Sequence, residues 1–88
     1  MNVDYTKCPV SYMKDGLKRY IENGIPAGSF MTAMLANDFL GAVMKADATN
    51  LLRLRDWALF IANDLPDECW GSYEKVENWK GLDNEQAY

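Results

Sequence analysis

The chain contains no histidine and only two cysteines, Cys8 and Cys69, so several kinds of chemistry lack the side chains they need. Catalysis by a Ser–His or Cys–His pair needs an imidazole base, and a tetrahedral zinc site needs four ligands drawn mainly from cysteine and histidine. Neither can be assembled here. A signal-peptide pattern is also missing from residues 1–15, which predicts a cytoplasmic protein with reduced, free thiols. Sequence alone does not show whether the two thiols lie close together.

Long apolar runs and basic stripes are missing too. The most apolar stretch, residues 30–44, is shorter than the ~20 residues that span a bilayer, and Asn37-Asp38 interrupts its middle. We therefore expect no membrane association. The net charge is −4, and residues 64–88 carry seven acidic side chains against two lysines. Such a surface repels phosphate backbones, so we expect no direct binding to nucleic acid.

Hydrophobic residues are plentiful, at 49% of the chain, and they follow helical rather than alternating patterns. Capping residues, stop signals and apolar spacing predict helices near residues 10–23, 29–45, 48–64 and 72–80. Residues 1–7 are expected to form an irregular arm and residues 81–88 an irregular tail. The predicted fold class is all-α, a single domain over residues 1–88, built as a small bundle of three main helices plus a short C-terminal helix.

The third predicted helix carries a regular apolar seam with spacings of three and four residues, which is typical of packed helices. Trp57 lies beside this seam and is expected in the core. The seam consists of Leu51, Leu54, Ala58, Ile61 and Leu65.

The second predicted helix is apolar on nearly every side. A helix of this kind is either central in its fold or partly covered by another protein. If the N-terminal arm and the last helix cover the remaining apolar residues, the chain is a monomer. If one side of this helix, or Leu52 and Leu59 on the third helix, stays uncovered, a homodimer is the expected solution. The side in question consists of Met31, Leu35, Phe39 and Ala42.

Asn37 and Asp38 interrupt this apolar helix and have two interpretations. They could recognise a partner or, together with Asp47 and Asn50, form an oxygen-rich pocket for a hard cation. Alternatively, they satisfy nearby backbone groups and face water.

Tryptophan and acidic residues are interspersed near the C-terminus. On a binding surface the indoles would anchor a partner and the carboxylates would face its basic groups, whereas a solvated face over an aromatic core would look the same in sequence. The residues expected to contact a partner protein are Glu68, Trp70, Glu74, Glu77, Trp79, Asn37 and Asp38.

Signals for catalysis are weak. Asp38, Asp47 and Asp56 recur at nine-residue steps, but nothing in this spacing places their carboxylates around one substrate atom. The glycines match no phosphate-binding loop. We expect no catalytic residue, no metal and no cofactor.

Several short strings carry a resemblance to known proteins. Residues 20–30 read YIENGIPAGSF, and they are followed by Asn37-Asp38, Ala46-Asp47, Asn50, Pro66 and residues 69–72, CWGS. This pattern, which extends over most of the chain, resembles short uncharacterised phage and prophage proteins, although Ala27-Gly28 stands where Pro-Gly or Gly-Gly is expected.

The resemblance implies a protein made in the cytoplasm of an infected bacterium. Small acidic phage proteins of this size often bind a host or defence protein and block it, as anti-CRISPR proteins do, and this is the function we expect. One alternative is an oligomeric regulatory or structural protein in phage DNA metabolism. Another is an enzyme that uses a carboxylate-bound metal.

Overall fold

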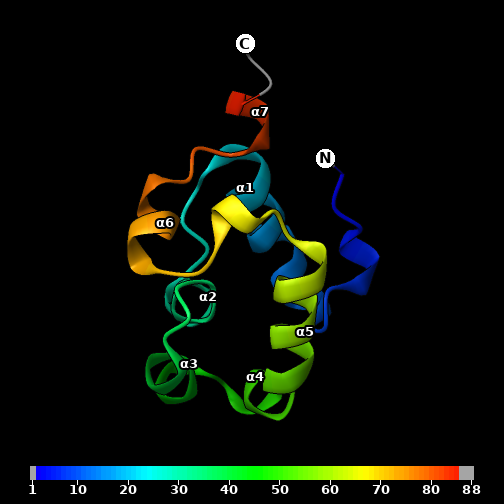
Figure 1. Ribbon diagram of the computed structural model, residues 1–88. Coiled ribbons are helices and arrows are strands. Elements are labelled where there is room, and N and C mark those ends of the chain that lie inside the picture. Colours follow the sequence, from blue (N-terminus) through cyan, green and yellow to red (C-terminus); the bar gives the residue numbers. More distant parts are fainter. Residues whose placement is uncertain (1, 86–88) are drawn as a thin grey trace.

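Helices and short loops form the whole of the computed structural model, which describes residues 2–85 (Figure 1). No strand occurs in that range, so the all-α class is confirmed. In chain order the elements are η1 (Tyr5–Lys7), η2 (Ser11–Met13), α1 (Lys14–Asn23), α2 (Ser29–Leu35), α3 (Phe39–Lys45), α4 (Ala48–Leu52), α5 (Leu54–Asp64), η3 (Asp67–Cys69), α6 (Tyr73–Asn78) and α7 (Leu82–Glu85).

The arrangement is more broken than the predicted bundle. The helix expected over residues 29–45 is two helices, α2 and α3, because Asn37 adopts a left-handed backbone with φ 62°. The helix expected over residues 48–64 is interrupted at Arg53 between α4 and α5. The first helix, expected from residue 10, begins with the 3₁₀ turn η2 and becomes α-helical only at Lys14.

The core lies between α1, α2 and α5. Leu17, Tyr20 and Ile21 of α1 are buried against it, and α2 is the most enclosed helix, with Phe30, Met31, Ala33 and Leu35 all buried. The radius of gyration of 12.1 Å equals the roughly 12 Å expected of a compact chain of this length. Within residues 2–85 no helix combines the length and the hydrophobicity that crossing a bilayer requires.

The apolar seam predicted on the third helix faces the core only in part. Ile61 and Leu65 are buried and Leu54 packs against the core. Leu51 and Ala58 are exposed, whereas Asn50 is buried at the start of this stretch and Trp57 is fully buried, as expected. The indole N–H of Trp57 donates to the side-chain oxygen of Asn50 over 2.9 Å. The break at Arg53 turns α5 relative to α4, so Trp57 and Phe60 point inward and part of the seam points outward.

The C-terminal segment is ordered against α1, contrary to the irregular tail expected from residue 81; residues 86–88 of that tail lie outside the described range. Leu82, on α7, is buried, and α7 packs on α1. Gly81 has φ 97°, and a Cβ at this position would collide with the carbonyl of Glu22. At the end of α1, Gly24 has φ 73° and approaches the backbone of Lys80. Paired glycines thus let this segment lie directly on the end of α1.

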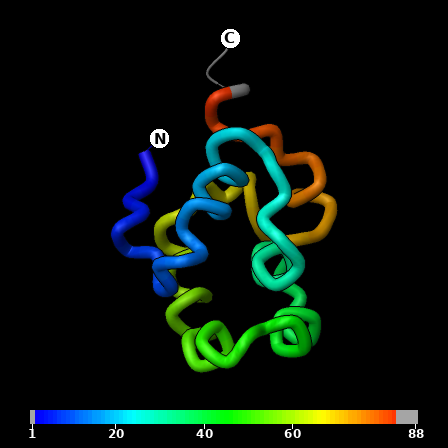
Figure 2. Tube along the Cα trace, turned by 180° about the vertical axis from the view of Figure 1, so that it is seen from behind, coloured from blue at the N-terminus to red at the C-terminus, as the bar shows by residue number. Residues whose placement is uncertain are grey.

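Different helices form the two ends of the molecule. The end of α1 and α7 lie together at one end, while α3 and α4 form the opposite end in both the front and the rear views (Figure 1, Figure 2). α5 runs along the side of the molecule between these ends.

Candidate protein-binding groove

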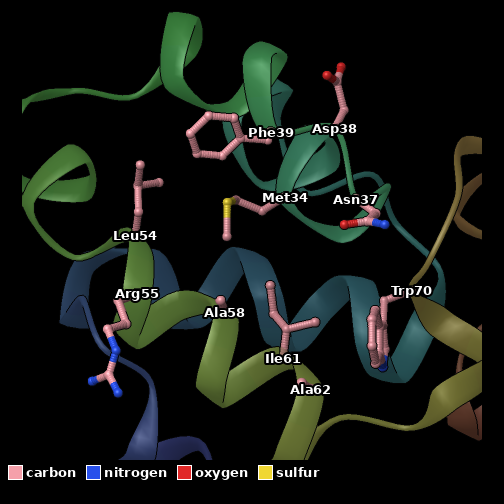
Figure 3. A pocket seen from close by; sticks show the side chains of 10 residues that line it. All are labelled: Met34, Asn37, Asp38, Phe39, Leu54, Arg55, Ala58, Ile61, Ala62 and Trp70. Carbon is pink, nitrogen blue, oxygen red and sulfur yellow. The ribbon is translucent and has the colours of Figure 1, made fainter.

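An open apolar groove lies between α5 and the junction of α2 and α3 (Figure 3). Its volume is about 480 Å³. We call it the α3–α5 groove. The residues that line it are Met34, Asn37, Asp38, Phe39, Leu54, Arg55, Ala58, Ile61, Ala62 and Trp70.

The junction of α2 and α3 forms one wall. Asp38 caps α3, since its Oδ1 accepts from the backbone N–H of Gly41 over 2.9 Å. A Cβ at residue 41 would collide with the Asp38 carboxylate, so glycine permits the cap. Together with the left-handed Asn37, the cap turns the chain and sets Phe39 at the mouth of the groove. The structural interpretation is therefore confirmed for Asp38, whose carboxylate accepts a backbone N–H.

Trp70 closes one end of the groove. The backbone N–H of Gly71 donates to the carbonyl of Leu35 over 2.7 Å, which fixes the turn after η3 to the end of α2. The Tyr73 hydroxyl donates to Asp38 Oδ2 over 2.5 Å and ties α6 to the start of α3. These two contacts bring Trp70 next to Asn37 and Asp38, although more than thirty residues separate them in the sequence.

α5 forms the other wall. Leu54, Ala58, Ile61 and Ala62 follow the i, i+4, i+7, i+8 spacing of one helix face, so this wall is about 12 Å long at 1.5 Å per residue. The two alanines keep it shallow. Arg55 stands at the end where α5 begins, opposite the end that holds Trp70 (Figure 3).

Large apolar side chains are exposed beside the groove. Phe39, Leu40 and Met44 of α3 and Leu52 of α4 are each 70–85% exposed. We call these four side chains the apolar end. Small proteins rarely leave several large apolar groups exposed on neighbouring elements unless another molecule covers them. On α3 only Ala42 is buried. The side predicted to stay uncovered is therefore wrong except at Phe39, because Met31, Leu35 and Ala42 are all buried.

The acidic residues predicted to bind a partner lie elsewhere. Glu68 and Glu74 border a second hollow, which Lys75 and Lys80 also line, and Glu77 is exposed on α6 but does not line it. Trp79 borders the same hollow, yet it is only 6% exposed. Its indole N–H donates to the carbonyls of Tyr20 and Ile21 over 3.0 and 3.1 Å. Trp79 is thus part of the core, where it joins the last turn of α1 to the C-terminal segment.

The three regularly spaced aspartates are separate structural elements. Asp38 and Asp47 cap α3 and α4, and each accepts a tyrosine hydroxyl, from Tyr73 and Tyr12 respectively. Asp56 pairs with Arg53 over 2.6 Å. In the described part of the chain, no three acidic or thiol side chains are grouped as metal ligands would be.

Both thiols are free. Cys8 is half-buried and Cys69 is buried, and burial raises the pKa of both, that of Cys69 to about 12. A thiol with a raised pKa carries little thiolate at neutral pH and is a poor nucleophile.

Comparisons of the chain with protein-family models, with curated protein sequences and with solved structures give no match. Of the residues predicted from sequence, Trp70, Asn37 and Asp38 meet in the α3–α5 groove. Sequence reasoning missed the groove wall on α5, because the spacing of Leu54, Ala58 and Ile61 is typical of a helix face that packs in a core. The sequence did contain a signal for a second contact surface on α5. Trp57 and Phe60 form another apolar stripe on this helix, and a single stripe is enough to contact the core.

Proposed function

We propose that this protein acts by binding another protein and not by catalysis, and that the α3–α5 groove with the apolar end is the binding surface. The observation that carries the proposal is the combination of an apolar groove with four large side chains left 70–85% exposed beside it. Arg55 and Trp70 stand at the two ends of the groove, and both residue types are enriched among the strongest contacts of protein interfaces.

The energetics of this surface fit a protein partner. Complete burial of a Phe, Leu or Met side chain contributes about 1.5–3 kcal/mol, so the four residues of the apolar end together offer at most about 6–12 kcal/mol. Association itself costs roughly 4–15 kcal/mol. The apolar end alone therefore supports weak binding at best, and tight binding requires the groove as well.

The resemblance to phage and prophage proteins indicates the class of partner. We propose a bacterial host or defence protein whose action is blocked when this chain covers it, with an anti-CRISPR role as the most specific form. The acidic residues Glu68, Glu74 and Glu77 are then secondary contacts, because lysines share their surface and exposed charges contribute little to affinity.

A plasmid-interference assay tests this role directly. A bacterium with an active CRISPR system rejects a targeted plasmid, and expression of the inhibitor should restore transformation. We expect Phe39→Glu and Ala58→Glu to abolish the effect, because each places a charge in the groove, and the triple reversal of Glu68, Glu74 and Glu77 to lysine to retain most of it. If both groove variants still restored transformation, the groove would not be the surface that inhibits the CRISPR system.

Other defence systems are tested in the same way, by the efficiency with which a sensitive phage forms plaques. Affinity capture with the wild-type chain, compared with the Phe39→Glu chain as control, identifies the bound protein. A protein retained equally by both chains is not a partner of this surface.

The alternative of an oligomeric regulatory protein draws on the same surface, since a second copy could cover it. The two functions predict different results of affinity capture. An oligomeric regulatory protein would capture only further copies of the chain and replication proteins. We do not propose an enzyme, because Asp38, Asp47 and Asp56 each have separate local partners.

A further inference from the structure

The two ends of the α3–α5 groove differ in hydrogen-bonding character. Arg55 and Leu54 lie at one end, and Asn37, Asp38 and Trp70 lie at the other (Figure 3). A guanidinium offers only donors, whereas the Asp38 carboxylate offers only acceptors. Asn37 offers both an acceptor and donors, and the buried Trp70 indole N–H is a donor, so the negative charge of Asp38 is what distinguishes this end. The middle of the groove, between Met34 and Ala58, is apolar.

Arg55 is without a partner among residues 2–85. No hydrogen bond or ion pair joins it to any residue of the described range, in contrast to Arg53, which pairs with Asp56. A guanidinium left unpaired at the edge of an apolar groove is suited to a carboxylate on another molecule. At the acceptor end, Asp38 Oδ1 and Oδ2 each accept one hydrogen bond, which leaves further acceptor sites on the carboxylate.

This distribution is self-complementary. In a two-fold dimer the same patch meets itself, so each contact occurs twice. If the two-fold axis lies in the interface and runs across the groove, the donor end of one copy faces the acceptor end of the other. The grooves then run antiparallel, and the protruding Phe39 of each copy meets the apolar middle of its partner.

We propose that the occupant of the α3–α5 groove in the isolated protein is a second copy of this chain, placed by such a two-fold axis. Arg55 of each copy faces Asn37 and Asp38 of the other, and the apolar end of each copy is covered. A host protein that binds the groove has to displace this second copy, so dimerisation limits the availability of the binding surface.

Sedimentation equilibrium of the full chain, from about 1 μM to about 1 mM, measures the association. We expect the mass to rise from 10.0 kDa toward twice that value as concentration increases. A mass that stays at 10.0 kDa over the whole range overturns the proposal.

Phe39→Glu locates the interface. Phe39 is largely exposed, and an acidic residue in the first turn of a helix is favourable, so the monomer should keep its fold. We expect the dissociation constant of the dimer to rise at least about tenfold. Ile25→Glu is the matched control, because Ile25 is also exposed but follows α1 at the opposite end of the molecule. A dimer unaffected by Phe39→Glu, or one equally weakened by Ile25→Glu, contradicts this interface.

The charge pairing is tested by a pair of substitutions at opposite ends of the groove. Asn37→Asp adds an acceptor charge and keeps a residue type that tolerates the left-handed backbone. In the wild-type background it should tighten the dimer, by up to about fivefold. In a chain that already carries Arg55→Glu, the same substitution should weaken the dimer, because two carboxylates then face each other. An effect of the same sign in both backgrounds overturns the antiparallel placement.

These outcomes are independent of the proposed host-binding role. A chain that is monomeric at all concentrations, yet loses inhibition on Phe39→Glu, would refute the dimer and leave the proposed function intact. A chain that dimerises through Phe39 but inhibits nothing would refute the proposed function and leave the dimer intact.

Discussion

At the scale of single residues, two tyrosine–aspartate pairs hold the ends of α3 and α4 in place. Asp38 and Asp47 each accept a backbone N–H as helix caps and a tyrosine hydroxyl over 2.5 Å, from Tyr73 and Tyr12. The tyrosine hydrogen bond is the main cause that lowers the pKa of each carboxyl below its ordinary 3.8, and the cap adds to it. The same bond raises the pKa of each tyrosine above 10.0.

The stability of the fold should therefore fall at acidic pH. A lowered carboxyl pKa contributes stability that is complete above 3.8, the unfolded value, and is lost as the pH falls through the lower folded value. Tyr73→Phe should raise the pKa of Asp38 and make the acid loss of stability shallower. Carboxyl carbon NMR titration measures this pKa. Tyr12→Phe is the matched control, since it should move the pKa of Asp47 and leave that of Asp38 unchanged; a shift of both carboxyls would show that the pairs are not separate.

The buried amide of Asn50 supports the core through Trp57. Asn50 is 3% exposed and its side-chain oxygen accepts the indole N–H over 2.9 Å. Asn50→Ala leaves that buried donor unpaired, which should cost about 1–3 kcal/mol of unfolding free energy in urea denaturation. In a Trp57→Phe background the donor is gone, so the same Asn50→Ala change should cost clearly less. Equal costs in the two backgrounds would mean that the hydrogen bond is not the reason.

At the scale of elements, the sequence predicted that helices form and where most of them lie, but not where two of them break. The end of α1 was readable because Asn23-Gly24-Ile25-Pro26 is a strong stop signal, and Gly24 is left-handed as that signal requires. The break after α2 was not readable, because the apolar pattern continues through it. The left-handed Asn37 makes the turn there, and Asp38 caps the next helix while it accepts from Tyr73, which is far away in the sequence. The tail was misjudged for the same reason, since its order depends on α1.

Asn37 should control the break between α2 and α3. A residue with a Cβ pays roughly 1–2 kcal/mol in the left-handed region, and asparagine tolerates this region better than alanine does. We expect Asn37→Ala to lower the thermal midpoint and Asn37→Gly to leave it unchanged or raise it. Thermal denaturation followed by circular dichroism compares the two. If alanine proved the more stabilising substitution, the left-handed turn could not be what holds α3 in place.

Trp79 should behave as a core residue and not as a partner contact. Its indole is buried and donates to two carbonyls of α1. Trp79→Ala should lower the unfolding free energy by about 3–5 kcal/mol, whereas exposed Glu77→Ala, two residues away, should change it by less than about 0.5 kcal/mol. Urea denaturation of both variants checks this contrast. If the Trp79→Ala chain were as stable as the wild type, Trp79 would not be a core residue and would again be a candidate partner contact.

At the scale of the whole molecule, charge and apolar surface are concentrated in different places. The acidic excess of residues 64–88 was visible in the composition, and it suggested that the C-terminal region meets the partner. The apolar end was harder to foresee, because apolar residues in a helix are normally assigned to the core. In this chain the break at Asn37 turns α3 away from α1 and leaves only Ala42 buried. The folded arrangement, more than the composition, decides which surface is free to bind.

The response of self-association to salt separates these two surfaces. Each chain carries a net charge of −4, so two copies repel each other at low ionic strength. Raising the salt from about 0.05 M to about 0.5 M screens this net repulsion as well as the attraction between Arg55 and Asp38, while contacts between apolar side chains persist. We expect the dissociation constant of the dimer, measured by sedimentation equilibrium, to stay level or fall. Reversal of Glu68, Glu74 and Glu77 to lysine changes the net charge of each chain from −4 to +2, which reduces the repulsion and should not weaken the dimer. If the copies instead met through acidic α6 and the lysines of a second chain, salt and the triple reversal would both weaken association, and the α3–α5 groove would not be the interface.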